Sequence, residues 1–309
     1  MFALKIIAQQ DEYHVYLVNL GKFFCGLRKR IMNPPNQNSS LLLKSVKHVI
    51  AVASGKGGVG KSTTTVNLAL AMARTGAKVG VLDADIYGPS IPLMLGIEDF
   101  KPDAVGEKKM TAASAHGITA QSIGFLINSE DAAIWRGPMA AGALTQLMNE
   151  TAWPELDYLF VDMPPGTGDI QLTLSQKVPL TGAVIVTTPQ DVALSDARKG
   201  IQMFQKVNVP ILGVVENMSI HICSQCNHQE PIFGAQGGKR TAEQYQVPFL
   251  GALPLQLSIR EAMDMGKPTL VSDPDSAISD LYIQIANQIV KQVAAQQQSS
   301  VSISISDDE

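Results

Sequence analysis

The sequence predicts an α/β fold with an open, mostly parallel sheet that carries helices on both faces. Two observations predict it. Short runs that are apolar on both faces alternate along the chain with longer segments of helical periodicity. A glycine-rich phosphate-binding pattern, Gly55–Ser62, stands directly after one apolar run and directly before a helical segment. Because ligands of such sheets bind at the carboxyl ends of the strands, we expect the functional residues there.

Short apolar runs are expected to form the strands, and longer periodic segments the helices between them. The expected strands are His48–Ala53, Lys78–Asp83, Tyr158–Met163, Ala183–Thr188, Ile211–Glu216 and Phe249–Leu253. The expected helices include Thr63–Arg74, which Gly76 follows as at a helix C-terminus, and Ala193–Val207, with apolar residues at helical spacing.

The chain of 309 residues is expected to hold one large domain between two less regular ends. Residues 1–45 indicate an irregular N-terminal segment that ends in a linker rich in Pro, Asn and Ser. Residues 46–293 are expected to form the P-loop domain. Residues 294–309 are rich in Gln and Ser and end in acidic residues, which favours a disordered acidic tail.

Charge and hydropathy argue against two classes of partner. A formal net charge of −4 is not typical of a protein whose main ligand is nucleic acid. No apolar stretch approaches the roughly 18 to 20 residues of a membrane span, so no membrane partner is expected. Residues 1–20 show no uninterrupted apolar core, which argues against a secretory signal. We expect the bacterial cytoplasm rather than the mitochondrial matrix.

The glycine-rich loop is expected to cradle phosphates. A strand, a glycine turn and a helix N-terminus direct successive backbone N–H groups toward anionic oxygens. Lys61 would reach the β- and γ-phosphates, and the Ser62 hydroxyl would join the ligands of Mg²⁺. Lys56 has no task in this scheme. The nucleotide-binding residues expected in this loop are Gly55, Lys56, Gly57, Gly58, Val59, Gly60, Lys61, Ser62 and Thr63.

Acidic residues close two of the expected strands. Asp83 and Asp85 stand at i and i+2 on an extended backbone, so both carboxylates are expected to face the phosphate site. One would orient the attacking water while the other supports Mg²⁺. Asp162 closes another apolar run in the manner of a Walker B acid, and with Ser62 it is expected to hold Mg²⁺. The three motifs together predict binding and hydrolysis of a nucleoside triphosphate.

A cysteine pair, Cys223 and Cys226, has the C-x-x-C spacing of a metal or redox site. Two thiolates on one loop supply half of the roughly four ligands that zinc or an iron–sulfur cluster takes. Two chains related by a twofold axis would supply four. The residues alone leave open a zinc site that includes His221 or His228, a redox pair, and a buried pair without metal. Cys25 is not expected to join them.

These motifs resemble those of the deviant Walker A ATPases, a group that includes MinD, ParA and the nitrogenase iron protein. Within that group the chain most closely resembles the Mrp/ApbC family of iron–sulfur cluster carriers. The resemblance runs over residues 46–293 and includes Trp135–Pro138, Val215–Ser219 and Cys223–Cys226. Many bacterial members carry an additional N-terminal domain, and residues 1–45 are not expected to form one intact, because they are few and irregular in pattern.

The resemblance implies a homodimer that forms around ATP. Lys56 would reach the phosphates bound to the partner, so that Lys56, Lys61 and Asp85, the water-orienting acid, are the expected catalytic residues. Asn217 would contact the adenine, and the backbone around Pro254 would pack on it.

The resemblance also implies a [4Fe-4S] cluster at the homodimer interface, bound by Cys223 and Cys226 of both chains. The expected cofactors are ATP, Mg²⁺ and this cluster. The expected partners are apo iron–sulfur proteins and an assembly scaffold. The alternative function is a MinD/ParA-like positioning or partitioning ATPase with a structural zinc site.

Overall fold

The computed structural model describes residues 43–106, 108–126 and 137–301. All of them lie within one compact unit, Leu42–Glu309. The strands are β1 (Val46–Ala53), β2 (Val79–Asp83), β3 (Ala104–Val105), β4 (Lys109–Met110), β5 (Ala113–Ala115), β6 (Ile118–Ser122), β7 (Leu156–Asp162), β8 (Gly182–Thr187), β9 (Ile211–Glu216), β10 (His221–Ile222), β11 (Gln229–Glu230) and β12 (Phe249–Ala252).

Helices alternate with these strands. They are α2 (Lys61–Ala73), α3 (Ile91–Leu95), α4 (Gly137–Glu150), α5 (Asp169–Lys177), α6 (Asp191–Lys206), α7 (Gly237–Gln244), α8 (Leu257–Asp264), α9 (Thr269–Ser272) and α10 (Ala277–Val301), with a 3₁₀ turn, η2, at Ile123–Phe125. None of the described helices is long and apolar enough to cross a bilayer.

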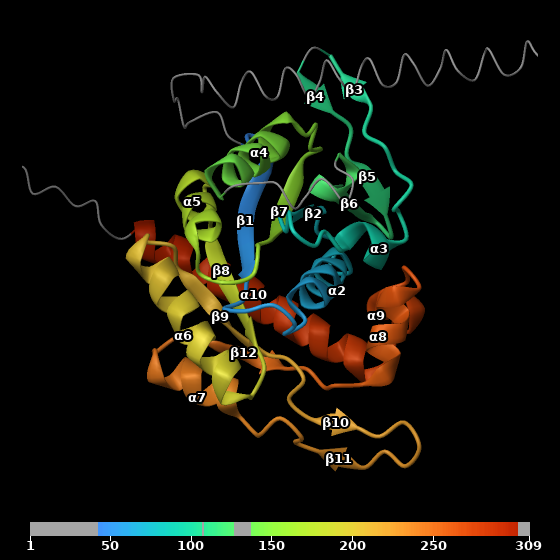
Figure 1. Ribbon diagram of the computed structural model, residues 1–309, viewed down its shortest axis with the longest axis vertical. Coiled ribbons are helices and arrows are strands. Elements are labelled where there is room, and N and C mark those ends of the chain that lie inside the picture. The colour runs from blue at the N-terminus through green and yellow to red at the C-terminus, as the bar shows by residue number, and fades with distance from the viewer. Residues whose placement is uncertain (1–42, 107, 127–136, 302–309) are drawn as a thin grey trace, which may run out of the picture. The chain divides into compact units, whose positions relative to one another are not determined.

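One eight-stranded sheet organises the unit, in the order β12-β9-β8-β1-β7-β2-β6-β5 (Figure 1). All of its neighbouring strands run parallel except β5 and β6, which form an antiparallel hairpin at one edge. The order reverses beside β1, since the chain leaves β1 for β2 on one side of it and later crosses from β7 over β1 to β8 on the other side. The loop after β1 therefore leaves from the crevice where ligands bind in such folds.

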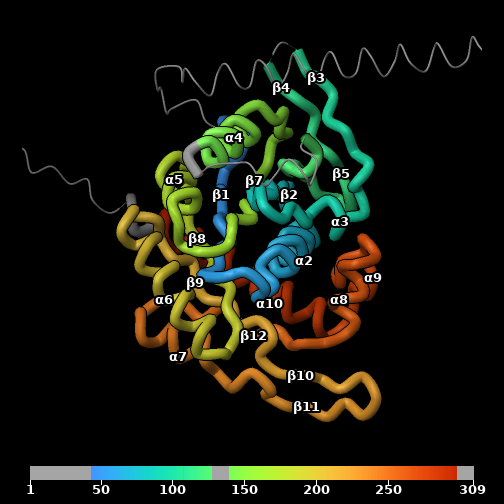
Figure 2. Tube along the Cα trace, viewed as in Figure 1, coloured from blue at the N-terminus to red at the C-terminus, as the bar shows by residue number. Residues whose placement is uncertain are grey.

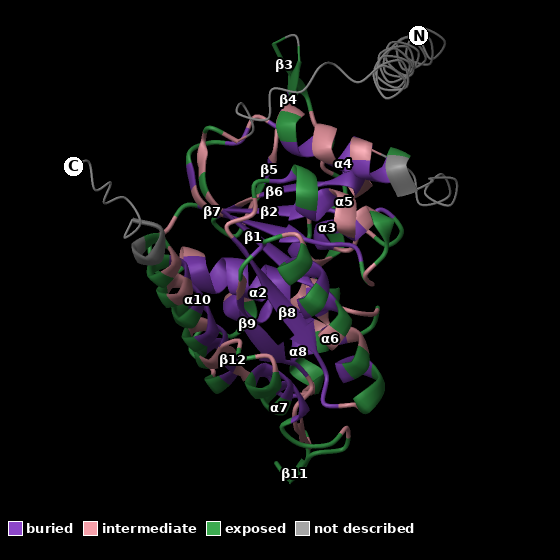
Figure 3. Cartoon of the chain, turned by 90° about the vertical axis from the view of Figure 1, so that its left-hand side faces the viewer, coloured by how far each residue is buried: buried purple, intermediate pink, exposed green. Residues whose placement is uncertain are grey.

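Each face of the sheet builds its own apolar core, because successive side chains of a strand point to opposite faces. In β1, Ile50 and Val52 belong to the core beneath α2, α8 and α10, whereas Val49 and Ala51 belong to the core beneath α4, α5, α6 and α7. The central strands are buried on both faces and the exposed residues lie on the outer sides of the helices (Figure 3). The predicted fold class is confirmed.

The six expected strands are present as β1, β2, β7, β8, β9 and β12, with ends that differ by at most two residues. The expected helices after β1 and β8 are present as α2 and α6. Two strands of the sheet, β5 and β6, were not expected, because Ile118–Ser122 ends in the polar pair Gln121 and Ser122, which are buried here.

The C-terminal prediction needs correction. We expected residues 294–309 to be disordered, but α10 continues to Val301, so residues 294–301 are helical. Alanine and glutamine are good helix formers, and a buried stripe that includes Ile285, Ile289 and Val293 leads the helix into this segment. The remaining part of the expected tail lies outside the described residues, as do residues 1–42.

A small hairpin of β10 and β11 projects from the sheet just after β9, as the trace shows (Figure 2). His221 pairs with Glu230 and Ile222 with Gln229. The loop between these strands carries the C-x-x-C pair, so the cysteines lie at the tip of a two-stranded ribbon.

Candidate functional site

The glycine-rich loop connects the end of β1 to the start of α2. Gly60 is the residue before α2 and has φ of +79°, and Gly58 has φ of +81°, conformations that favour glycine. Gly55 is required for another reason, since a Cβ there would lie 2.2 Å from the backbone carbon of Asp196 in α6. The loop therefore leads directly into the N-terminus of α2. The first N–H groups of a helix have no partner within the helix and can bind a phosphate.

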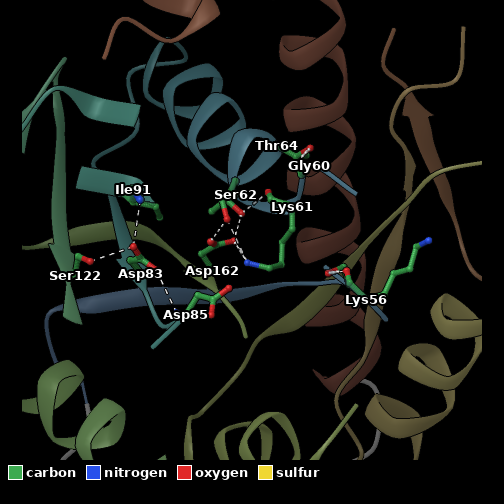
Figure 4. Close-up of polar contacts among 12 residues, drawn as sticks. Lys56, Gly60, Lys61, Ser62, Thr64, Asp83, Asp85, Ile91, Ser122 and Asp162 are labelled. Carbon is green, nitrogen blue, oxygen red and sulfur yellow. Dashed lines mark hydrogen bonds and ion pairs between the residues drawn. The ribbon is translucent and has the colours of Figure 1, made fainter. Parts of the chain in front are cut away.

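Lys61 and Asp162 form a buried ion pair at the bottom of this loop. Lys61 Nζ lies 2.8 Å from Asp162 Oδ1, and the two side chains are only 6% and 1% exposed. The Ser62 hydroxyl donates to Asp162 Oδ2 at 2.6 Å (Figure 4). The Thr65 hydroxyl lies 2.8 Å from Oδ1. Strand β7 places Asp162 beside β1, so residues from two parallel strand ends meet here.

Asp83 lies next to Asp162 across the β2–β7 pair, but its hydrogen bonds lead away from the glycine-rich loop. Its carboxylate accepts from the Ile91 N–H at the start of α3, from the Ser122 hydroxyl of β6 and from the Asp85 N–H (Figure 4). Asp83 thus holds the 83–91 loop in place. Its expected contact with the phosphate site stays a prediction.

Asp85 is less buried than Asp83 and lies within the electrostatic reach of Lys61. Burial raises the pKa of the Asp85 carboxyl, the Lys61 charge opposes this rise, and Asp162 adds to it. Figure 4 shows Asp85 beside Asp162. The water-orienting role expected for Asp85 stays a prediction.

Replacing Asp83 by asparagine is expected to flatten the dependence of stability on pH between about 4 and 7. Burial, and then the charge of Asp162, raises the pKa of Asp83 from 3.8 to about 7. The folded protein keeps a proton that the unfolded chain releases above pH 3.8, so wild-type stability falls as the pH rises through this window. The full shift corresponds to about 4 kcal/mol, and urea unfolding across this pH range measures it.

Asp157→Asn is the control for that experiment. The Lys47 hydrogen bond lowers the pKa of Asp157, so its contribution to stability is present above pH 3.8 and is lost below it. The Asp157 variant should therefore keep the wild-type slope between pH 4 and 7. An Asp83→Asn variant with that same slope would show that Asp83 ionises normally in the folded protein.

Asn217 and Pro254 lie at adjoining strand ends. The Asn217 side-chain amide donates to the Val59 carbonyl of the glycine-rich loop at 2.9 Å, and its nitrogen fills the space where Gly60 would carry a Cβ. Pro254 is buried between Leu253, which donates to the Glu216 carbonyl, and Leu255. Asn217 thus supports the glycine-rich loop directly. The adenine contacts of both residues stay predictions.

Lys56 is set apart from the other charged residues of the loop. Its side chain points away from Lys61, Ser62 and Asp162 (Figure 4), and its ammonium pairs with none of the described residues. The backbone is nevertheless fixed, because the Ser54 hydroxyl donates to the Lys56 carbonyl at 2.9 Å. A Cβ at Gly57 or Gly58 would meet no atom within 4 Å, so the neighbouring loop faces open space.

The cysteine pair occupies the exposed tip of the β10–β11 hairpin. The Cys223 N–H donates to the His228 carbonyl, and the Asn227 N–H donates back to the Cys223 carbonyl, which closes the turn. Backbone N–H groups of Gln225 and Cys226 donate to the Cys223 sulfur, and with the Cys226 thiol they lower the pKa of Cys223. The two sulfurs are therefore already turned toward each other.

The described residues of one chain do not assemble a complete metal site. Within the described part of the chain, no group of three or more His, Cys, Asp and Glu residues gathers as metal ligands. His221 and His228 are close in sequence but do not complete a set with the cysteines. The zinc site considered as an alternative therefore has no support in the described residues.

The side chains fit a magnesium nucleotide. The Ser62 hydroxyl and the Asp162 carboxylate are hard oxygen ligands 2.6 Å apart, which is the donor chemistry that Mg²⁺ prefers. The open space in front of Gly57 and Gly58 is where close approach of phosphates to the backbone needs glycine. When bound, Mg²⁺ would neutralise developing charge on the phosphates.

Two residues of the site were not expected from the sequence. Thr65 lies one helical turn after Ser62 and contacts Asp162, and helical spacing was the signal that could have found it. Ser122 lies on the unexpected strand β6, so no signal placed it beside Asp83. Trp135, Arg136 and Cys25 lie outside the described residues, and Gly137 and Pro138 begin α4.

Comparison with known proteins identifies the family. The model of the ParA family described as a NUBPL iron-transfer P-loop NTPase matches residues 45–290. An iron–sulfur cluster carrier protein of Salmonella typhimurium is 58% identical over 265 residues, which cover 86% of this chain and 70% of the relative. The iron–sulfur cluster transfer protein NUBPL of Dictyostelium discoideum is 49% identical over 83% of this chain and 80% of its own.

Solved structures agree with this placement. A nucleotide-binding protein of Archaeoglobus fulgidus in complex with ADP is 37% identical, with a TM-score of 0.67 over 77% of this chain and 93% of that one. The cell division ATPase MinD of Pyrococcus furiosus, at 23% identity and a TM-score of 0.60 over 79% of this chain and 98% of its own, shares the fold. The chain therefore belongs to the NUBPL-type iron-transfer P-loop NTPases of the ParA family.

Proposed function

We propose that this chain is an ATP-hydrolysing iron–sulfur cluster carrier that holds a [4Fe-4S] cluster between two copies of itself. The cysteine pair carries the proposal. It presents two thiols at an exposed hairpin tip, and no other metal-ligating residue of the described chain completes the set. Carrier and transfer proteins among the relatives support the cargo, since they are named for iron–sulfur clusters.

The exposure of the two thiols is consistent with transfer of a bound cluster to another protein. Cys226 is exposed and Cys223 is half-buried, so an acceptor protein can approach the sulfurs. A cluster needs about four ligands, and the hairpin of a second copy supplies the missing two. Two-fold sharing also makes the affinity for the cluster depend on the arrangement of the two chains.

The nucleotide site supports the ATPase half of the proposal. Lys61 and the N-terminus of α2 are placed to bind phosphates, and Ser62 with Asp162 is placed to hold Mg²⁺. The choice of ATP over other triphosphates rests on family membership. Lys56, whose ammonium is directed away from its own loop, would reach the phosphates bound to the second copy.

The partners follow from the cargo. We expect apo iron–sulfur proteins as acceptors and an assembly scaffold as donor. The bacterial cytoplasm is the proposed compartment. It is supported by identity of 57% and 58% to carriers of Escherichia coli and Salmonella typhimurium, against 49% to the Dictyostelium NUBPL protein and 50% to the mouse one.

Cluster transfer to a defined apo-acceptor tests the function. Wild-type protein reconstituted anaerobically should pass its cluster to an apo-ferredoxin, and Mg-ATP should change the rate at least several-fold. Cys226→Ala should transfer nothing, because half of its thiolates are missing. Ser224→Ala, a change in the same loop that removes no proposed ligand, is the matched control and should transfer at the wild-type rate.

Two results would contradict the proposal. Transfer that survives Cys226→Ala unchanged would mean that the cluster sits elsewhere. A colourless protein that binds zinc in stoichiometric amounts after reconstitution would favour the alternative, a positioning or partitioning ATPase with a structural zinc site.

A further inference from the structure

The hydroxyl of Thr65 has two acceptors within reach. It lies 2.8 Å from Asp162 Oδ1 and 2.9 Å from the carbonyl oxygen of Lys61, one helical turn earlier. A hydroxyl has only one proton to donate. Asp162 also forms an ion pair with Lys61, and hydrogen bonds to a carboxylate are roughly twice as strong as those between neutral groups. The proton therefore goes to Asp162.

Thr65 is also a rigid donor. The side chain is completely buried in α2, the helix that packs between the sheet and α10. A β-branched side chain in a helix has few χ1 rotamers, and the one that approaches the Lys61 carbonyl is the one that also reaches Asp162. The backbone of α2 thus sets the position of the hydroxyl.

The two oxygens of Asp162 have separate neighbours. Oδ1 contacts Lys61 and Thr65, while Oδ2 accepts from Ser62, the other proposed ligand of Mg²⁺. We propose that Thr65 is a positioning residue, whose hydroxyl fixes the Asp162 carboxylate so that Oδ2 stays directed toward Ser62. This inference rests on the proposed magnesium nucleotide site.

The Thr65 hydroxyl should matter most for the orientation of Asp162 when Lys61 contacts the phosphates of a bound nucleotide. The Lys61 ammonium would be shared between Asp162 and a bound nucleotide, whereas the Thr65 hydroxyl is completely buried and contacts only Asp162 and the Lys61 carbonyl among the described residues. Loss of the hydroxyl should therefore lower the affinity of the site for Mg²⁺ more than it lowers the stability of the protein.

The test measures how nucleotide binding depends on Mg²⁺. Fluorescent ATP is titrated into the full-length protein at a series of Mg²⁺ concentrations, and also in EDTA. Thr65→Val removes the hydroxyl and keeps the shape. It should raise the Mg²⁺ concentration for half-maximal binding about tenfold, while binding in EDTA stays at the wild-type level. Thr65→Ser restores the donor and should restore the wild-type magnesium dependence.

Thr64→Val is the matched control. The Thr64 hydroxyl makes the same kind of bond to a carbonyl one turn earlier, that of Gly60 at 2.8 Å, but does not contact Asp162. It should leave the magnesium dependence unchanged. Thr65→Ala provides a second variant if the valine protein does not fold, since alanine suits a helix interior.

The outcomes separate this inference from the proposed function. A Thr65→Val or Thr65→Ala protein with the wild-type magnesium dependence would overturn the positioning role, even though the nucleotide site stands. Equal losses in the Thr64 and Thr65 valine variants would also overturn it, since the cause would then be the helix. Wild-type protein that binds no nucleotide at all would instead refute the nucleotide site itself.

Discussion

Lys61→Ala is expected to abolish ATP hydrolysis and to lower the free energy of unfolding at neutral pH by about 3 kcal/mol. Lys61 is the only cation that the structure places against Asp162 among the described residues, at 2.8 Å, and both side chains are buried. Its removal leaves a buried carboxylate beside a second one, Asp83, with only neutral donors. Uncompensated buried charge is among the most destabilising changes that one substitution makes.

The pH dependence identifies the cause. The Lys61 charge lowers the pKa of the Asp83 carboxyl, so its removal should raise that pKa further. The variant should then lose more stability than the wild type as the pH rises, because its folded state holds the Asp83 proton more tightly. Urea unfolding at pH 7 and pH 5, both without nucleotide, should show a smaller deficit at the lower pH. Fluorescent-nucleotide titration of the same samples reports the lost phosphate contact.

Lys47→Ala supplies the matched control for this experiment. Lys47 Nζ lies 2.7 Å from Asp157 Oδ1, nearly the distance of the buried pair, but the lysine side chain is 72% exposed. Water already solvates such a pair, so little change in stability is expected. Equal losses in the two variants would show that burial of the Lys61–Asp162 pair does not determine its effect.

Cys223→Ala or Cys226→Ala is expected to abolish cluster binding. Reconstituted wild-type protein should be brown, with one cluster for every two chains, and should elute as a dimer. Either variant can offer at most two thiolates to a site between two copies, which is half of a ligand set of about four. Visible absorbance, iron content and size-exclusion chromatography of the same samples measure this result.

Cys25→Ala is the control, because the hairpin cysteines alone are proposed as ligands. It should keep the full absorbance and iron content of the wild type. A wild-type protein that carries one cluster per chain as a monomer would contradict the shared site. A Cys25 variant without a cluster would mean that the ligand set includes the N-terminal segment.

The sheet could be predicted where buried strands leave a continuous apolar pattern. The C-terminal parts of β1 and β7 and all of β8 are buried, so these stretches are mostly apolar and the runs stand out. Strand β6 could not be predicted this way, because it buries Gln121 and Ser122. Gln121 donates to Thr151 and Ser122 to Asp83, residues far away in the chain, so the partners that make this burial favourable were not visible.

In the candidate site, too, residues that belong to a contiguous pattern could be predicted, and residues that depend on distant partners could not. Residues of the glycine-rich loop were predictable because phosphate binding imposes a contiguous pattern on one turn. Thr65 was not, because its partner Asp162 comes 97 residues later and only the pairing of β1 with β7 brings them together. The C-terminal helix shows the opposite error. The polar composition of residues 294–309 predicted disorder, but α10 continues through residues 294–301, beyond its last buried apolar residue among those described.

The hydrogen bond between Asn217 and Val59 gives the molecule a short line of communication. It joins the glycine-rich loop to the end of β9, and the chain runs from there within a few residues into the cysteine hairpin. A displacement of the loop at Val59 would therefore act, through the Asn217 side chain, on the chain segment that leads to the β10–β11 hairpin. In the proposed carrier, the nucleotide site and the cysteine pair are thus connected within one subunit, and the second copy would complete the ligand set of the cluster.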